Sequence, residues 1–367
     1  SGYAMVGASG PWRWQRQRRD TMRLRYAFAA ALVAVMVAAA SGSATQAQQV
    51  TLKLHHFVPA QSNQQKFWFE PWAKKLEQES AGRLKVEIYP SMQLGGRQPQ
   101  LFDQAKDGVV DIVWTVSGTT PGRFPRLEVF ELPFLSHAIG EKTAPAVWEF
   151  YENFARDELK DVKPLAVWGF GKGILFTKDV VIKGPADAKG LKLRASNRQT
   201  NDAFALIGAQ PQSIPPPGVP EALAKGVVDG VVFPYDAVIP FKLDELTNRV
   251  SEFGGDRTFY NSVLLFVMNK AKYDGLADDL KKVIDANSGA ALSRDLGRKW
   301  DEWDQIGRAA VLKRNTPIHV IDGADLAAWK KATEPIAAKW IEERDKAGDK
   351  GADLVKAAEN LVAKYAK

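Results

Sequence analysis

The sequence predicts an α/β fold in which strands and helices alternate and the C-terminal third is helical. Short runs of alternating or β-branched apolar residues are separated by stretches with helical periodicity, a pattern typical of layered α/β proteins with largely parallel strands. From about residue 276 onward, the apolar residues recur mainly at helical spacing. The chain has 367 residues, of which 45% are hydrophobic and 25% are charged, and this length suffices for two domains with sizeable cores.

The alternation is clearest in the first half of the chain. A strand is expected at 50–59, where Leu52 and Leu54 share a face, and a helix follows at 62–82, with Ser62 as its N-cap. Three further elements are expected in order, namely the alternating strand 83–90, the helix 97–108 and the buried, β-branched strand 109–116.

The second half continues the alternation before it becomes helical. Strands are expected at 165–171, 190–195 and 227–233. Helices are expected around Trp300, where apolar residues recur at helical spacing, and over 324–346 and 350–367. A short strand at 317–321 separates the first of these helices from the other two.

The first 47 residues have the features of a presequence. The stretch 22–47 begins with a basic segment, continues with an apolar run from Tyr26 to about Ala40 and ends in small residues, as a secretory signal peptide does. The apolar run is short for a membrane span. We therefore expect Met22 to be the initiator and the signal peptide to be removed on export, with an uncleaved membrane anchor as the alternative.

The charge balance argues against nucleic-acid binding. The whole chain has 50 basic and 43 acidic residues, but residues 1–47 hold six arginines and one aspartate, which leaves 44 basic and 42 acidic residues in the remainder. Such a balanced remainder gives no support for the basic surface that nucleic acid requires. The chain has no cysteine, so an exported protein of this sequence must be stabilised by its hydrophobic cores alone.

The sequence contains no recognisable motif of a catalytic or metal site. The histidines at 55, 56, 137 and 319 lack the spacing of metal ligands, and no G-x-S-x-G motif occurs. The paired glycines of QLGGR, at 93–97, lack the residues of a phosphate-binding loop. We therefore expect a binding protein without a cofactor or metal, and an exported enzyme is the less favoured alternative.

Six segments occur in an order that resembles one known family. They are YPSMQLGG (89–96), KDGVVDIVW (106–114), FELPFL (130–135), KGLKLRASN (189–197), GAQPQSIP (208–215) and EALAKGVVDGVVFP (221–234). Together they resemble the periplasmic substrate-binding proteins of tripartite ATP-independent periplasmic (TRAP) transporters, the DctP-type family. The resemblance runs from about residue 50 to the C-terminus, and the ordered set is more specific than any one segment.

The resemblance implies a two-lobed periplasmic-binding-protein fold, with a ligand cleft between the lobes and long C-terminal helices. We expect lobe I to comprise 48–169 and 259–300, and lobe II to comprise 170–258 and 301–367. The implied function is capture of an organic acid in the periplasm by hinge closure and its delivery to the membrane permease, with no stable membrane insertion after signal cleavage. A sensor that uses the same cleft is the alternative.

The resemblance also implies that Arg194 binds the carboxylate of the ligand. Members of the family use the arginine of a K-[LI]-R segment, which is KLR at 192–194 in this chain. A guanidinium presents parallel donors to both oxygens of a carboxylate, and it keeps its charge at any physiological pH. Strand alternation alone places Lys192, Arg194 and Ser196 on one face, and it leaves exposure to solvent as the other interpretation.

Further ligand contacts follow from the resemblance. Lys172 is expected near the carboxylate, with a solvent-facing lysine of the hinge as the alternative. Asn197 either bonds a 2-hydroxyl or 2-oxo group of the ligand or caps a helix. From the other lobe, three residues are expected to line the cleft: Gln98, Trp114 and Ser117.

Phe233 occupies a position that holds an asparagine in many members of the family. Its ring makes this wall of the cleft apolar, because a polar ligand group that faced it would have no hydrogen-bond partner. We therefore expect a monocarboxylate with an aromatic or branched apolar end, such as a 2-hydroxy or 2-oxo acid related to mandelate. A C4 dicarboxylate or a sugar acid fits this wall less well.

Overall fold

A computed structural model describes residues 2–3 and 49–367 of the chain, and it has the α/β architecture that the sequence predicts. The predicted signal peptide at 22–47 lies outside the described residues. Within the part of the chain that is described, no helix is long and apolar enough to cross a membrane. Residues 49–367 form one compact unit, which contains both sheets and all the helices discussed below.

The first sheet has five strands in the order β2-β1-β3-β10-β4. β1 pairs in parallel with β2 and β3, whereas β10 lies antiparallel between β3 and β4. The bounds are β1 Val50–His55, β2 Leu84–Tyr89, β3 Ile112–Val116, β4 Val162–Trp168 and β10 Leu264–Asn269. β3 and β10 are buried along their whole length, so the centre of this sheet is covered on both faces.

The second sheet has six strands in the order β11-β9-β5-β8-β6-β7. β6 pairs in parallel with β7 and β8, β5 is antiparallel to β8 and β9, and β11 adds to β9 in parallel. The bounds are β5 Ile174–Thr177, β6 Lys192–Ala195, β7 Gln210–Ser213, β8 Gly230–Phe233, β9 Arg249–Phe253 and β11 Ile318–Ile321. The chain passes from one sheet to the other three times: between β4 and β5, between β9 and β10, and between β10 and β11.

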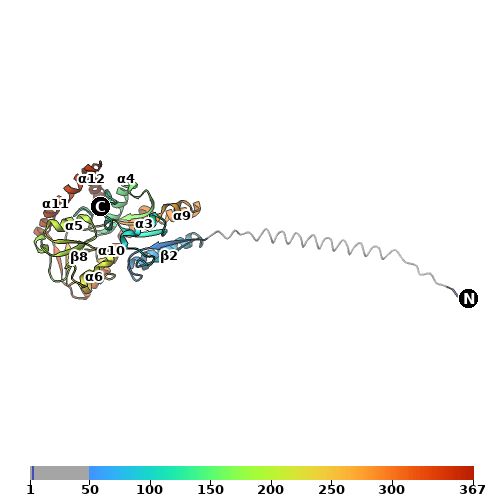
Figure 1. The fold of residues 1–367 in the computed structure, drawn as a ribbon, viewed down its shortest axis with the longest axis horizontal. Helices are drawn as coiled ribbons and strands as arrows, with labels where there is room; N and C mark the ends of the chain where they lie inside the picture. The colour runs from blue at the N-terminus through green and yellow to red at the C-terminus, as the bar shows by residue number, and fades with distance from the viewer. Residues whose placement is uncertain (1, 4–48) are drawn as a thin grey trace. The chain divides into compact units, whose positions relative to one another are not determined.

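Helices cover both sheets (Figure 1). Their bounds are α2 Glu70–Glu79, α3 Leu101–Lys106, α4 Gly140–Phe154, α5 Arg198–Leu206, α6 Val219–Ala224, α7 Leu243–Leu246, α8 Lys270–Asp274, α9 Asp278–Ala286, α10 Gly289–Lys313, α11 Gly323–Lys346 and α12 Gly351–Tyr365. A short π-helical segment, Gln65–Phe69, precedes α2. The long helices α10, α11 and α12 confirm the helical C-terminal third, in agreement with the periplasmic-binding-protein fold class.

The long helix α10 joins the two halves of the unit. It packs against α4 and β4 on the side of the first sheet, and against the 3-10 turn Tyr235–Ala237 that follows β8 of the second sheet. Two glycines of α10 permit these contacts, because a Cβ at Gly297 would collide with the Gly140 carbonyl and a Cβ at Gly307 with the Tyr235 carbonyl. In Figure 1, α10 lies between the side that carries β2 and α3 and the side that carries β8 and α6.

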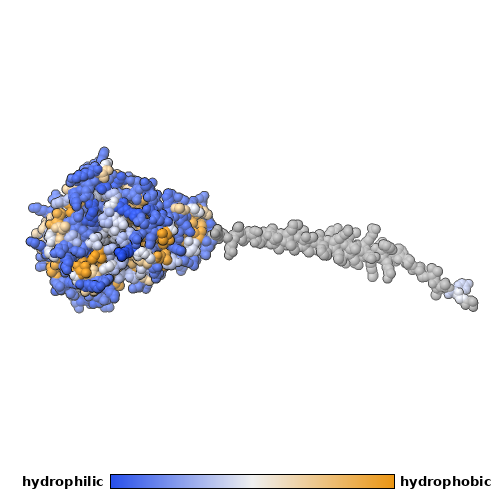
Figure 2. Space-filling view, in the orientation of Figure 1, coloured by the Kyte–Doolittle hydropathy of each residue, from blue (hydrophilic) through white to orange (hydrophobic). Residues whose placement is uncertain are grey.

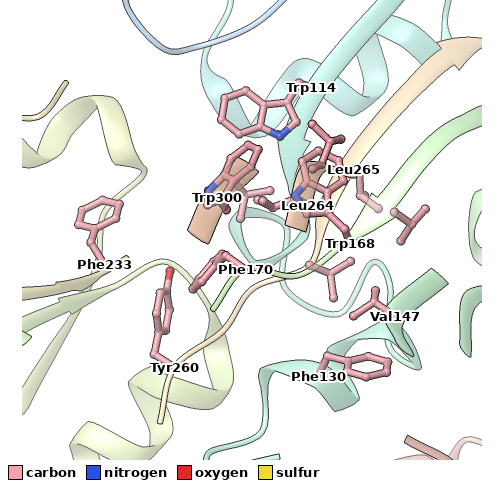
Figure 3. Packing of buried hydrophobic residues seen from close by; sticks show 14 of the residues in the cluster. Trp114, Phe130, Val147, Trp168, Phe170, Phe233, Tyr260, Leu264, Leu265 and Trp300 are labelled. Carbon is pink, nitrogen blue, oxygen red and sulfur yellow. The ribbon is translucent and has the colours of Figure 1, made fainter. Parts of the chain in front are cut away.

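An aromatic cluster fixes α10 on the first sheet. The Trp300 ring lies 5.8 Å from that of Trp114 and 5.5 Å from that of Trp168 between centroids, both in edge-to-face arrangements. All three side chains are buried, and Figure 3 shows them beside Leu264 and Leu265 of β10. The face of the described unit seen in Figure 2 is mostly hydrophilic with small hydrophobic patches.

Several predicted elements are present, and the main departures are antiparallel strands. The predicted strand 109–116 is present as Ile112–Val116. Ser62 accepts a hydrogen bond from the Gln65 amide at 3.2 Å, as an N-cap does. The expected helix 97–108 is shorter, a 3-10 turn followed by α3. Four strands were not predicted, namely β5, β7, β9 and β10, and β5 and β10 make the sheets mixed rather than largely parallel.

Candidate ligand-binding site

A cavity lies between the two sheets, and side chains from both of them line it. Trp114 of β3 and Leu264 of β10 come from the first sheet, Phe233 of β8 comes from the second, and Trp300 belongs to α10. Phe170, in the crossing segment that follows β4, contributes a further ring. Figure 3 shows Phe233 facing Trp300 and Phe170 across this space.

The cavity is a narrow slot with a mainly apolar wall. The volume open to the centre of a water molecule is only about 50 Å³. A small, mainly apolar space bordered by aromatic side chains suits an aromatic ring better than a sugar with many hydroxyl groups. The polar interruptions of the wall are few: Gln64, Ser196, Asp236 and Tyr260.

Arg194 lies directly behind the Phe233 wall of the cavity. It belongs to β6, it is completely buried, and its guanidinium carbon lies 4.1 Å from the centroid of the Phe233 ring. The Nε atom donates to the Ile214 carbonyl at 2.7 Å, and Nη1 donates to the Val232 carbonyl at 3.3 Å. The stacking and the two carbonyls fix the plane of the guanidinium, so its remaining donors have a defined direction.

The charge of Arg194 has no counter-ion among the described residues. No carboxylate of residues 49–367 lies within ion-pair distance of it, and its Nη2 atom is buried with no hydrogen-bond partner. Burial lowers the pKa of Arg194 to about 10, because a charge is poorly solvated in the interior, while the nearby Tyr260 hydroxyl favours the charged form. The group is thus a cation at neutral pH, and a buried cation without a partner is costly unless an anion binds beside it.

Two hydroxyl groups lie on the cavity side of Arg194. The hydroxyls of Ser196 and Tyr260 form a short hydrogen bond to each other, and both residues line the cavity. Ser196 follows β6 directly, two residues after Arg194, whereas Tyr260 comes from the segment between β9 and β10. The guanidinium and these hydroxyls together offer the donors that a carboxylate requires.

The structure brings together three of the residues predicted to form the site. Trp114 and Phe233 line the cavity, and Arg194 stacks on Phe233. Ser196, Tyr260, Gln64 and Asp236 were not predicted. The position of Ser196 was available from the alternation of β6, whereas the other three approach the cavity from distant segments that show no local signal.

The other four predicted site residues do not line this cavity. Lys172 lines a separate depression together with Asp301 and Arg308. Asn197 caps α5, accepting from the Thr200 amide at 2.8 Å, and its Nδ2 donates to the Asn261 carbonyl at 2.6 Å.

Ser117 and Gln98 are also held by protein groups. The Ser117 hydroxyl donates to Glu131 at 2.8 Å, and the Gln98 amide donates to Thr115 at 3.2 Å. Ligand contact by Lys172, Asn197, Ser117 and Gln98 stays a prediction.

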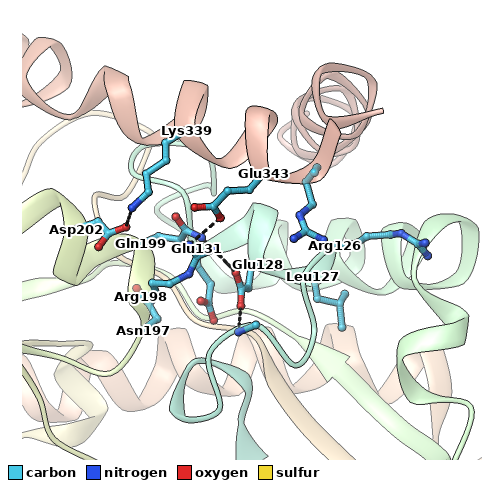
Figure 4. Close-up of polar contacts among 12 residues, drawn as sticks. Arg126, Leu127, Glu128, Glu131, Asn197, Arg198, Gln199, Asp202, Lys339 and Glu343 are labelled. Atoms are coloured by element: carbon cyan, nitrogen blue, oxygen red, sulfur yellow. Dashed lines mark hydrogen bonds and ion pairs between the residues drawn. The ribbon is translucent and has the colours of Figure 1, made fainter. Parts of the chain in front are cut away.

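A polar network joins the 3-10 turn Leu127–Glu131 to α5 and α11 (Figure 4). Arg198, at the start of α5, donates to Glu128 at 3.0 Å and to Glu343 of α11 at 2.7 Å. Gln199 donates to the same carboxylate of Glu128 at 3.2 Å, and Glu128 also accepts from the Gly122 amide at 2.6 Å. The network holds the N-terminus of α5, and with it the end of β6 that carries Arg194, in place.

The pKa of Glu131 in this region predicts a pH effect on stability. Burial, reinforced by the neighbouring Glu128, raises the pKa of Glu131 from 4.5 to about 8. The folded state thus keeps a proton on Glu131 that the unfolded chain releases above about pH 4.5. The contribution of Glu131 to the free energy of unfolding is therefore complete below about pH 4.5 and is lost as the pH rises toward 8. The variant Glu131→Gln is expected to melt higher than the wild type at pH 8 and to lose less stability between pH 5 and 8.

Thermal melts at several pH values would test this prediction. The exposed Glu359 of α12 provides a matched control, because Glu359→Gln removes the same charge at the surface and should follow the wild-type pH profile. An identical pH profile for Glu131→Gln and the wild type would contradict the assignment of a protonated Glu131.

The composition of the site favours an organic anion over a metal ion. Within residues 2–3 and 49–367, no group of three or more His, Cys, Asp or Glu side chains could hold a metal ion. The described site therefore presents a buried guanidinium, two hydroxyls and an aromatic slot, which is a suitable arrangement for a flat carboxylate.

Comparison with known proteins yields one family and a set of solved structures. The model of the DctP family, described as bacterial extracellular solute-binding protein, family 7, matches residues 54–344. A marine metagenome TRAP solute-binding protein specific for aromatic acid ligands, from an unidentified microbe and solved with 3-hydroxybenzoate, is 46% identical, with a TM-score of 0.85. The match covers 87% of this chain and 100% of that chain.

Two further structures are also similar. A TRAP solute-binding protein from Rhodoferax ferrireducens, in complex with copurified benzoate, is 43% identical with a TM-score of 0.84, covering 87% of this chain and 99% of that chain. A TRAP periplasmic solute-binding protein from Bordetella bronchiseptica with bound (R)- and (S)-mandelate is 26% identical with a TM-score of 0.79, covering 86% and 99%.

Proposed function

The chain belongs to the DctP family of bacterial extracellular solute-binding proteins, and we propose that it binds an aromatic monocarboxylate in the slot between its two sheets. Its expected role is to capture this acid in the periplasm and to deliver it to a TRAP membrane permease. Neither step requires chemistry on the ligand, in keeping with a family of binding subunits rather than enzymes.

The observation that carries the proposal is the buried Arg194 without a counter-ion. Its Nη2 atom is buried without a partner, and its guanidinium stacks on Phe233, which with Trp300 forms part of the cavity wall, so the site combines a cation with a surface suited to a ring. One charge-assisted hydrogen bond contributes about 1.5–3 kcal/mol, and an unpaired buried cation gains more from an anion than an exposed one does. A carboxylate provides the anion, and a planar ring fills the slot.

The related structures support an aromatic rather than a branched aliphatic end. Two of the relatives above 40% identity are described with 3-hydroxybenzoate and with benzoate, and the Bordetella protein is described with mandelate. These acids share a carboxylate close to a benzene ring. A 2-hydroxy or 2-oxo aromatic acid therefore remains within the proposed class, whereas a dicarboxylate would place a second charge against an apolar wall.

The proposed mechanism is closure of two lobes about the ligand. Lobe I would comprise 48–169 and 259–300 and lobe II would comprise 170–258 and 301–367, a division supported by the separation of the strands into two sheets. Arg194 would bind the carboxylate from lobe II, while Trp114 and Leu264 would cover the ring from lobe I. The ligand favours the closed form only through contacts that it makes with both lobes at once.

Thermal melts with a panel of acids test the proposal. The panel contains benzoate, mandelate, succinate and glucuronate, with benzamide as a neutral control of the same shape as benzoate. A ligand at about 100 times its dissociation constant adds about 2.7 kcal/mol, which raises the melting temperature by several degrees in a chain of this size. We expect benzoate and mandelate to raise the melting temperature and benzamide to leave it unchanged.

Two results would count against this assignment. If succinate or glucuronate stabilises the protein while benzoate does not, the aromatic ligand class is wrong although the family is unaffected. If benzamide stabilises it as well as benzoate, the carboxylate is not what the site recognises.

A further inference from the structure

The apolar wall of the cavity is interrupted at a second polar position. Gln64 and Asp236 both line the cavity, and their exposed fractions are only 2% and 7%. The Gln64 amide donates to Asp236 Oδ2 at 2.5 Å, although the two residues lie 172 positions apart in the chain. Gln64 precedes the π-helical segment Gln65–Phe69, and Asp236 lies in the 3-10 turn after β8, so the pair joins two separate parts of the wall.

This pair has acceptor capacity that the protein leaves unused. The Gln64 Oε1 atom is buried and has no hydrogen-bond partner in the part of the chain that the structure describes. Asp236 forms no ion pair with any lysine, arginine or histidine of residues 49–367. Burial raises the pKa of Asp236, in keeping with a carboxyl group that has no cation beside it. A buried acceptor without a donor costs free energy until a donor is supplied.

The position of the pair does not depend on a ligand. The Asp236 amide donates to Asp304 of α10 at 2.8 Å, and the turn that carries Asp236 packs directly against α10. On the other side, Ser62 caps the segment that carries Gln64. The acceptors are therefore fixed before binding, so a ligand donor would pay little for ordering them.

We propose that Gln64 and Asp236 accept a hydrogen bond from a hydroxyl group carried by the aromatic acid, so that hydroxylated aromatic acids bind more tightly than benzoate. This inference rests on the proposed function, because it requires the ring of an aromatic carboxylate to occupy the slot. A hydroxyl is the group that fits, since it donates to Gln64 Oε1 while remaining small enough for a narrow space. A methyl group has a similar size but would leave the acceptor unpaired.

The inference is tested by calorimetric titration of the protein with matched ligands. The set consists of benzoate, the three hydroxybenzoate isomers, the three methylbenzoate isomers and mandelate. We expect at least one hydroxylated acid to bind about 2- to 12-fold more tightly than benzoate, because a hydrogen bond to a neutral acceptor contributes about 0.5–1.5 kcal/mol. The methylbenzoate of the same substitution pattern should bind no more tightly than benzoate.

A variant pair links this preference to the proposed residue. Gln64→Met keeps the length of the side chain but removes its acceptor, and the affinity ratio of the hydroxylated acid to benzoate should fall to about one. Gln78→Met makes the same change on the exposed face of α2, and its ratio should stay at the wild-type value. A melting curve shows whether Gln64→Met is folded. If it is not folded, the wild-type affinities for the hydroxybenzoates and the matching methylbenzoates test the inference.

The outcomes separate this inference from the proposed function. If benzoate binds but no hydroxylated acid binds more tightly than benzoate or the matching methylbenzoate, Gln64 and Asp236 do not recognise a ligand hydroxyl. The proposed class of aromatic ligands is then unaffected. If the preference persists in Gln64→Met, other groups recognise the hydroxyl. If no aromatic acid binds at all, the proposed function itself fails.

Discussion

Replacing Arg194 with methionine is expected to weaken the binding of aromatic carboxylates by about 10²- to 10⁴-fold. The substitution removes the cation behind the Phe233 wall and with it two expected charge-assisted hydrogen bonds to the carboxylate, each worth about 1.5–3 kcal/mol. The ligand-free protein should keep its fold, because methionine fills a similar volume and the guanidinium is an unpaired buried charge whose removal is not costly in itself. The loss of the two carbonyl contacts, to Ile214 and Val232, sets the limit of any destabilisation.

Calorimetric titration with benzoate, together with a melting curve without ligand, measures both parts of this prediction. Arg194→Lys should retain part of the affinity, because an ammonium keeps the charge but lacks the planar fork. Arg123→Met is the matched control, since Arg123 stacks on Phe102 and pairs with Asp103 away from the cavity. Unchanged benzoate affinity in Arg194→Met would show that this residue does not bind the carboxylate.

The sequence was sufficient to predict the elements that have strong periodicity. The buried strand β3 could be predicted because it is a continuous run of apolar or β-branched residues. The helix α10 could be predicted because its apolar residues recur at helical spacing over several turns. The short strand β7, QPQS, could not, because it is a polar edge strand whose pairing with β6 is decided by the tertiary structure. β10 is apolar enough to be a strand, but its antiparallel insertion between β3 and β4 depends on a contact between segments far apart in sequence.

The site was predicted to the extent that one segment defines it. Arg194 and Phe233 lie on neighbouring strands, and each was expected from the segment in which it lies. Their contact, a ring stacked on a guanidinium, follows from the pairing of β6 and β8 and is not visible in either segment alone. Gln64 and Asp236 meet across 172 residues, so no local pattern identifies them. The family resemblance thus identified Arg194 and Phe233 as candidates, and the structure adds residues that no single segment identifies.

Replacing Phe233 with asparagine is expected to weaken benzoate binding by about 10- to 1,000-fold. The Phe233 ring contributes to the cavity in two ways, because one face covers the Arg194 guanidinium at 4.1 Å and the side chain forms part of the apolar wall. Loss of an aromatic contact with the ligand costs about 0.5–1.5 kcal/mol, and an amide that faces a ring without a partner adds about 1–3 kcal/mol. The ring is also stacked on Phe241, which would then border a partly empty space.

The comparison of several ligands shows why this variant is informative. Phe233→Asn should shift selectivity toward acids with a second polar group, so the affinity ratio of benzoate to succinate should fall. Phe233→Leu keeps the wall apolar without the ring, and we expect it to lose affinity for benzoate while keeping the preference over succinate. If Phe233→Asn leaves that ratio at the wild-type value, the wall at this position does not determine selectivity. Because Arg194 is present in all three proteins, any change in the ratio reports on the wall and not on the charge that binds the carboxylate.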